Sequence, residues 1–373
     1  MTRPLHPLHA RYMARAFELA RLGLGRTSPN PPVGAVVVSS GRIVGEGFHG
    51  GPGRPHAEIV ALRRAGPAAR GADCYVTLEP CCHFGRTPGC AQALAAAGIA
   101  RVFFAAADPD PHVCGRGANT LQAAGIEALH GPMTDFAKVF YAAYIWHRRH
   151  GMPWISAKVA ASLDGKVATA TGQSRWISSE ASRQLVHQWR DEYDAVMVGV
   201  GTVLADNPSL TCRRGDRPGR HPLRVVVDSQ ARTPPDAPVV TGPGDCIVAV
   251  TERAPEHAVR ALTLAGATVW RLPADEGGRV DLRALAKRLG SVGVVSALLE
   301  GGPTLLAAAI AYGIVNELMI FYAPMVIGGA TAPGIVGGTG VETLDEAGGW
   351  MVQSVERVGE DVLVRAVRCS PAS

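Results

Sequence analysis

The sequence His56-Ala57-Glu58, followed by Pro80-Cys81 and then by Cys90, decides how the first half of the chain folds. One imidazole and two thiolates are the three protein ligands of a catalytic zinc site, whose fourth position stays open for water. Glu58 follows His56 by two residues on the first turn of an expected helix, so its carboxylate reaches that water rather than the metal. The pattern predicts a catalytic zinc site with His56, Cys81 and Cys90 as ligands and Glu58 as the proton carrier.

A structural zinc site is the alternative interpretation of the same residues. Such sites usually close with four protein ligands, and Cys82 or His83 would supply the fourth here. A purely structural site gives no reason for Glu58. The His-x-Glu triplet therefore favours a catalytic site.

Apolar runs alternate with amphipathic segments along the whole chain. In the first half we expect helices at 8–22, 56–65, 90–97 and from 119, and strands at 33–38, 43–45, 74–78 and 101–106. In the second half we expect strands at 154–159, 195–199, 223–227, 246–250 and 294–299, with helices at 179–190, 254–265, 282–289 and 304–311. The polar stretch 147–153 separates the halves, so the sequence predicts two α/β domains, 1–150 and 151–373.

A Gly-Gly turn marks a candidate phosphate site in the second half. Glu300-Gly301-Gly302-Pro303 joins an expected strand to an expected helix, where backbone N–H groups can approach a pyrophosphate. Gly199-Val200-Gly201 begins like a dinucleotide fingerprint but lacks the third glycine, which disfavours the classical Rossmann arrangement.

Composition narrows the class of protein. The chain has 373 residues, 47% hydrophobic and 18% charged, which suits two globular domains. No apolar run reaches about 18 residues and no signal-peptide core is visible, so we expect a cytoplasmic protein without a membrane span. Its eight cysteines are then metal ligands or thiols rather than disulfides. No basic run with interleaved aromatic residues predicts nucleic-acid binding.

The cysteine loop carries a specific family resemblance. Thr77–Cys90, read as TLEPCCHFGRTPGC, resembles the long loop of riboflavin-specific deaminases, with eight residues between its ligands where the general signature has two. Four further motifs match that family: PNPPVG at 29–34, PHAE at 55–58, DPDP at 108–111 and GRG at 115–117. The resemblance implies that Asn30 and Asp108 bind the pyrimidine, and that His83 and Arg86 lie at the pocket rim.

Arg86, Cys82 and Asp110 bear on how this region would bind zinc and substrate. Arg86 is a plausible partner of the substrate phosphate, and equally an ordinary surface arginine. Cys82 stands where the family usually has a small residue such as Ser, and Asp110 where it commonly has Asn. The first departure bears on ligand identity and the second on a substrate contact.

The second half resembles the reductases that act on riboflavin intermediates. The resemblance lies in KVAASLDGK at 158–166, SRWIS at 174–178, GTVLADNPSLT at 201–211, VVVDS at 225–229 and EGGPTL at 300–305. It implies NADPH contacts at Ala160, Trp176, Thr202, Asp206, Ser229, Gly302, Pro303, Thr304, Leu305, Leu306, Ala307 and Ala308. It implies substrate contacts at Ser174, Arg190, Leu210, Arg213 and Glu300. Trp176 is alternatively a core aromatic and Ser229 a turn residue, while Lys158 and Asp206 both remain candidates for the general acid.

Together the resemblances identify the chain as a member of the bifunctional riboflavin biosynthesis family. They imply a cytidine-deaminase-like three-layer domain followed by a dihydrofolate-reductase-like domain, with one zinc ion and NADPH as cofactors. The implied reactions are hydrolytic deamination of 2,5-diamino-6-ribosylamino-4(3H)-pyrimidinone 5′-phosphate, then reduction of the ribosyl group of the product to ribityl. We expect a small-molecule substrate, no nucleic-acid or membrane partner, and a homo-oligomer.

Rival interpretations explain less of the sequence. A nucleoside or tRNA deaminase fused to an unrelated domain does not account for the long cysteine loop, and a zinc-stabilised binding protein does not account for Glu58. A reductase with a degenerate deaminase domain is disfavoured because every expected zinc and proton-transfer position is present.

Overall fold

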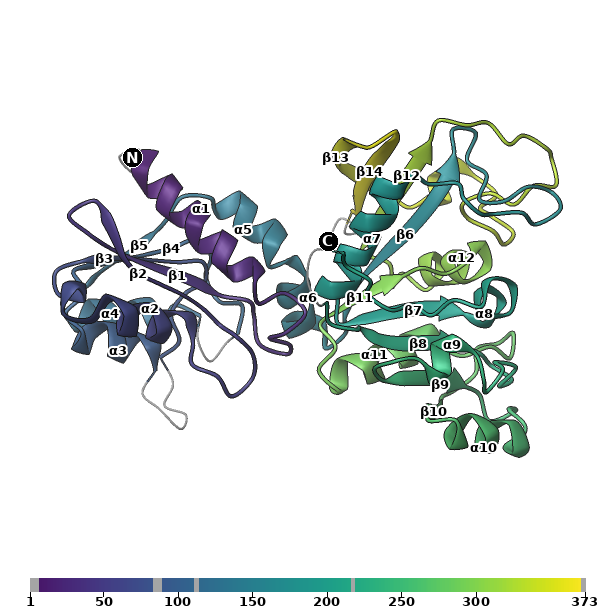
Figure 1. Cartoon of the computed structure of the whole chain (residues 1–373), viewed down its shortest axis with the longest axis horizontal. Helices are drawn as coiled ribbons and strands as arrows, with labels where there is room; N and C mark the ends of the chain where they lie inside the picture. The colour runs from purple at the N-terminus through teal and green to yellow at the C-terminus, as the bar shows by residue number, and fades with distance from the viewer. Residues whose placement is uncertain (1–6, 83–88, 111–113, 216–218, 370–373) are drawn as a thin grey trace. The chain divides into compact units, whose positions relative to one another are not determined.

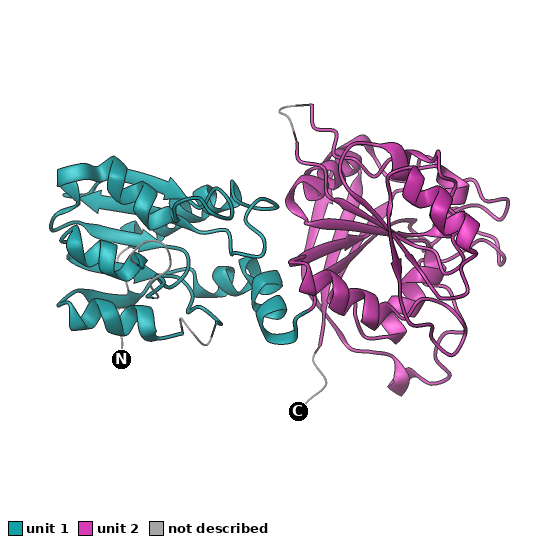
Figure 2. Cartoon of the chain, turned by 90° about the horizontal axis from the view of Figure 1, so that it is seen from below, with its two compact units in different colours: residues 1–151 teal, residues 152–373 magenta. Residues whose placement is uncertain are grey.

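The computed structural model describes residues 7–82, 89–110, 114–215 and 219–369. The chain forms two compact units, Met1–Gly151 and Met152–Ser373 (Figure 2). Both units are α/β, as the alternating pattern predicts. Within the described ranges, no helix has the length and apolar character needed to cross a membrane.

The first unit is built on a mixed five-stranded sheet. Its strands are β1 (Gly34–Ser39), β2 (Arg42–Phe48), β3 (Asp73–Val76), β4 (Arg101–Phe104) and β5 (Glu127–His130), in the order β2-β1-β3-β4-β5. Strand β1 is antiparallel to both neighbours, whereas β3, β4 and β5 are parallel.

Helices cover both faces of this sheet and make a three-layer unit. Figure 1 shows α1 (Pro7–Arg21) and α5 (Thr134–Phe140) on one face, and α2 (Ala57–Ala65), α3 (Cys90–Ala96) and α4 (Arg116–Ala123) on the other. Glycines allow the layers to approach closely: a Cβ at Gly34 would lie 2.0 Å from the Ala16 carbonyl oxygen of α1. A Cβ at Gly47 would lie 2.3 Å from the Ala57 carbonyl oxygen of α2. Any side chain there would push a helix off the sheet.

The second unit contains a nine-stranded sheet in the order β10-β9-β8-β7-β11-β6-β12-β14-β13. The strands are β6 (Trp154–Ser162), β7 (Ala195–Gly199), β8 (Leu223–Val227), β9 (Cys246–Val250), β10 (Thr268–Arg271), β11 (Ser296–Leu299), β12 (Glu317–Ala323), β13 (Trp350–Val358) and β14 (Asp361–Arg368). The seven strands from β10 to β12 are parallel; β14 is antiparallel to β12, and the edge strand β13 is antiparallel to β14.

Alternate residues of the parallel strands point to opposite faces of the sheet and pack against two different layers of helices. Met197 and Val225 belong to a core with α11 (Leu282–Ser291) and α12 (Pro303–Ala311). Val196 and Val226 belong to a core with α8 (Val200–Asp206), α9 (Pro238–Thr241) and α10 (Glu256–Leu264). Helix α7 (Glu180–Glu192) packs its Trp189 on Phe321 of β12. Burial on both faces explains why these strands are continuous apolar runs.

The polar stretch 147–153, at which the two units divide after Gly151, is not a linker throughout. Residues 147–150 are the last turn of α6 (Ala142–His150), and only Gly151, in the left-handed conformation at φ 64°, ends the helix. A polar helix face and a polar linker look alike in sequence, because both are exposed to solvent.

Candidate functional site

Two helix starts and one loop bring the predicted zinc ligands together. His56 is the residue that precedes α2, Cys90 is the first residue of α3, and Cys81 lies in the loop after β3. The three ligand atoms lie within 4.8 Å of one another. His56 Nδ1 is 3.2 Å from Cys90 Sγ and 3.5 Å from Cys81 Sγ. A nitrogen and two sulfurs at this spacing suit tetrahedral zinc with one position left open.

Glu58 points toward this cluster from the first turn of α2. Its side chain is only 4% exposed, and burial raises the pKa of Glu58 to about 7. The hydrogen bond from the Cys90 thiol lowers the pKa of Cys81, so Cys81 is the first of the two thiols to ionise. A carboxyl that titrates near neutrality is suited both to accept and to donate a proton.

A pocket of about 360 Å³ opens beside these residues. Asn30 and Asp108, the predicted pyrimidine contacts, line it together with His56, Glu58 and Cys81. The structure adds three lining residues that the sequence did not single out: His49, Tyr144 and Arg148. His49 Nε2 lies 3.4 Å from the Asn30 amide, and the Tyr144 hydroxyl donates to Asp108 at 3.2 Å. Tyr144 and Arg148 are four residues apart on α6, which is the one signal that would have paired them.

Glu79 and Gly117 pack the start of the cysteine loop against the N-terminus of α4. The buried Glu79 carboxylate accepts from the backbone N–H groups of Gly115 at 3.0 Å and Ala118 at 3.1 Å, at the start of α4. A Cβ on Gly117 would lie 1.9 Å from the Pro80 carbonyl oxygen. These two motif residues therefore have a structural explanation: they fix Pro80 and, with it, the adjacent Cys81.

Both predicted rim residues, His83 and Arg86, lie outside the described residues. Cys82 is described, and its thiol is not among the converging ligand atoms found in the described chain. Asp110, where the family commonly has Asn, forms an ion pair with Arg148. That cation compensates the charge that the departure introduces at the pocket.

The second unit contains a cavity of about 2080 Å³, large enough for a dinucleotide and a second ligand. Most of the predicted reductase residues line it: Ala160, Ser174, Trp176, Arg190, Thr202, Asp206, Leu210, Arg213, Ser229, Glu300, Gly302, Pro303, Thr304, Leu305 and Ala308. Leu306 is 1% exposed and packs into the core, and neither it nor Ala307 lines the cavity. Trp176 is 68% exposed, so it is not a core aromatic.

The Gly301-Gly302 turn leads into α12 at the cavity wall. A Cβ placed on Gly302 would meet nothing closer than Thr202 Oγ1 of α8, at 3.7 Å. The space in front of this helix start is therefore open to a ligand. Free N–H groups and the helix dipole favour an anion there, which fits a pyrophosphate.

Arg190 and Glu300 form a closed ion pair inside the cavity. The Arg190 Nε and Nη2 atoms each donate to a Glu300 carboxylate oxygen at 2.7 Å, and both side chains are almost buried. Lys158 lies in the same cavity wall, where burial lowers its pKa and the Glu300 charge partly offsets that effect.

The comparisons with known proteins agree with this division. Residues 7–106 match the model described as the cytidine and deoxycytidylate deaminase zinc-binding region, and residues 153–364 match the RibD C-terminal domain. The fold and the two sites define a zinc-dependent deaminase joined to an NADPH-dependent reductase.

Relatives extend the match to nearly the whole chain. The riboflavin biosynthesis protein RibD of Bacillus amyloliquefaciens is 40% identical over 95% of this chain and 95% of its own. The structure of Acinetobacter baumannii RibD superposes with a TM-score of 0.85 at 34% identity, covering 97% of this chain and 99% of that chain. A Thermotoga maritima diaminohydroxyphosphoribosylaminopyrimidine deaminase/5-amino-6-(5-phosphoribosylamino)uracil reductase also superposes at 0.85 and 34% identity, with 98% and 99% covered. The chain belongs to the RibD family, the bifunctional deaminase-reductases of riboflavin biosynthesis.

Proposed function

We propose that the first unit deaminates 2,5-diamino-6-ribosylamino-4(3H)-pyrimidinone 5′-phosphate, the reaction implied by the name of the Thermotoga relative. The observation that carries this assignment is the convergence of His56, Cys81 and Cys90 on a pocket wall that also contains the buried Glu58. Zinc, when bound by these three ligands, supplies the Lewis acidity that activates water.

The protein's own residues then move protons and orient the base. Glu58 accepts a proton from the attacking water and donates one to the departing amine, for which a pKa of about 7 is well matched. Asn30 and Asp108 present an amide and a carboxyl to the polar edge of the pyrimidine. His49 and Tyr144 hold these two side chains in place through their hydrogen bonds.

The substitution Glu58→Gln tests this assignment. It removes the proton carrier while keeping the shape of the side chain, so we expect deamination to fall at least about 10²-fold with zinc still bound. Reduction of substrate that has already been deaminated should continue at the wild-type rate. Loss of both activities would contradict two independent sites, and unchanged deamination would contradict the role of Glu58.

For the second unit we propose NADPH-dependent reduction of 5-amino-6-(5-phosphoribosylamino)uracil at the ribose C1′. The open Gly301-Gly302 corner supports binding of the NADPH pyrophosphate there, and NADPH supplies the reducing equivalent. Reduction at C1′ breaks the bond to the ring oxygen, which must take up a proton. Lys158 Nζ is the better donor, because burial lowers its pKa, whereas Asp206 is 38% exposed and lies beside Arg175.

We also infer that the chain acts in the cytoplasm as a homo-oligomer. The eight cysteines are thiols rather than disulfides, and a reducing compartment preserves the thiolates that zinc needs. Strand β13 is at the edge of the described sheet and exposes Met351, Val352 and Val355 by 56%, 58% and 63%. Exposed apolar side chains on an edge strand favour pairing with a second copy.

A further inference from the structure

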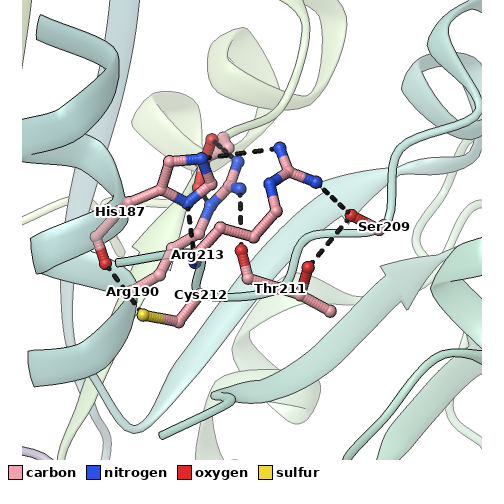
Figure 3. Close-up of polar contacts among 7 residues, drawn as sticks. His187, Arg190, Ser209, Thr211, Cys212 and Arg213 are labelled. Atoms are coloured by element: carbon pink, nitrogen blue, oxygen red, sulfur yellow. Dashed lines mark hydrogen bonds and ion pairs between the residues drawn. The ribbon is translucent and has the colours of Figure 1, made fainter. Parts of the chain in front are cut away.

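Among the arginines that line the reductase cavity, Arg190 and Arg213 lie close together (Figure 3) but differ in whether a carboxylate neutralises them. Arg190 is neutralised by the two-point contact with Glu300. Among the residues that the structure describes, Arg213 makes no ion pair; its guanidinium contacts are Ser209 Oγ, at 3.1 Å from Nη1, and the His187 ring. Arg213 therefore carries a charge that no described carboxylate cancels, whereas Glu300 already compensates the charge of Arg190.

His187 contacts Arg213 through both ring nitrogens (Figure 3). The Arg213 backbone N–H donates to His187 Nδ1 at 3.3 Å, and Arg213 Nη2 lies 3.4 Å from Nε2. His187 is half-buried on α7, three residues before Arg190, and it lines the cavity. A neutral ring carries one proton, so when Nδ1 accepts from the backbone N–H, Nε2 is protonated and faces Nη2 as a packing contact rather than a hydrogen bond. The ring therefore fixes the Arg213 backbone and limits by packing where the guanidinium can point.

The imidazole also leaves the charge of Arg213 intact. Burial, reinforced by the charges of Arg190 and Arg213, lowers the pKa of His187 to about 4, so the ring is neutral at neutral pH. Ser209, the other guanidinium contact, is neutral as well, and its hydroxyl is 3.1 Å from Thr211 Oγ1. A carboxylate in either place would position Arg213 equally well but would cancel its charge, as Glu300 does for Arg190.

We propose that His187 is a positioning residue of the reductase, which holds the Arg213 guanidinium, un-neutralised, where the 5′-phosphate of the substrate binds. This inference rests on the proposed role of Arg213. Phosphate recognition by a guanidinium depends on geometry, because its donors form a rigid planar fork. A mobile Arg213 would keep its charge and lose that preset orientation.

Steady-state kinetics of the full chain with deaminated substrate test the proposal. His187→Ala should raise the KM for the phosphorylated substrate about 2- to 10-fold, the range expected for a lost neutral hydrogen bond. The effect should fall on KM rather than kcat, and the Kd for NADPH, measured by fluorescence quenching, should not change. His187→Gln keeps a hydrogen-bonding group and should restore most of the affinity. His187→Glu should raise KM further, because its carboxylate would pair with Arg213.

Two comparisons separate this role from a general structural one. With the substrate lacking its 5′-phosphate, His187→Ala and wild type should have the same KM. In an Arg213→Ala background, His187→Ala should add nothing, because the two residues act through one contact. The matched control is His257→Ala, on the exposed face of α10 and outside the cavity, which should leave every constant unchanged.

Failure of the inference is distinguishable from failure of the proposed substrate site. If Arg213→Ala raises KM and His187→Ala does not, or if the two effects add, His187 does not act through Arg213. If Arg213→Ala leaves the KM of the phosphorylated substrate unchanged, the phosphate binds elsewhere and both assignments are overturned. Thermal melting of each variant shows whether the reductase unit is still folded.

Discussion

Cys81 and Cys82 are adjacent thiols with different surroundings. Cys81 Sγ lies 3.5 Å from His56 Nδ1 and accepts from the Cys90 backbone N–H at 3.4 Å, whereas Cys82 is outside the converging group. Cys81→Ser should therefore lose zinc and deaminase activity, and Cys82→Ser should keep most of both. Metal analysis of the two purified proteins measures this directly. Equal zinc loss in both variants would show that the ligand set includes Cys82.

At the level of single residues, sequence predicts those parts of a site that depend on chemistry and fixed spacing. The metal ligands and Glu58 are evident because zinc accepts few donor types and the H-x-E triplet places one carboxylate. His49, Tyr144 and His187 carry no such pattern. Their contacts arise only when β2, α6 and α7 are packed, so tertiary structure was needed to find them.

The start of α12 is the element on which the cofactor assignment depends. Gly302 has room for a side chain within the protein, with Thr202 Oγ1 at 3.7 Å as the nearest atom. Gly302→Val should therefore fold, yet its side chain would occupy the space in front of the helix N-terminus and raise the KM for NADPH at least about tenfold. Deamination should be unaffected. Kinetics with NADPH as the varied substrate measure the effect.

A matched control for this variant is Gly348→Val. Gly348 also has open space where a Cβ would lie, but it is outside the cavity, so NADPH binding should not change. Normal NADPH affinity in Gly302→Val would place the dinucleotide elsewhere in the cavity.

Three strands of the nine-stranded sheet agree with their predicted limits, whereas the interior strand β12 and the edge strands β10 and β13 were not predicted. Strands β7, β8 and β9 have the limits expected from their apolar runs, because a strand buried on both faces is apolar throughout. Strands β13 and β14 went unrecognised, since β13 is largely exposed and its sequence mixes polar and apolar residues. Helix α6 was missed because its last turn is entirely polar or basic.

Strand β13 is also where we expect copies of the whole molecule to meet. Val355→Lys places a charge on this edge and should shift the protein toward a smaller species, because an edge lysine opposes strand pairing. Sedimentation velocity measures the change. Val292→Lys is the control, since Val292 is similarly exposed at 58% but follows α11. An unchanged sedimentation coefficient in Val355→Lys would exclude β13 as the interface.

The order of strands in the second unit has a consequence for how the chain matures on the ribosome. Strand β6 is the first strand of that unit to be made, but its partners are β11 and β12, which end at Leu299 and Ala323. At roughly 5–20 residues per second, β6 waits on the order of 10–30 s before both neighbours exist. The first unit depends on no later segment for its sheet, so it can fold and acquire its metal during that interval. The nascent chain then carries a finished deaminase while its apolar β6 is still unpaired and in need of protection from aggregation.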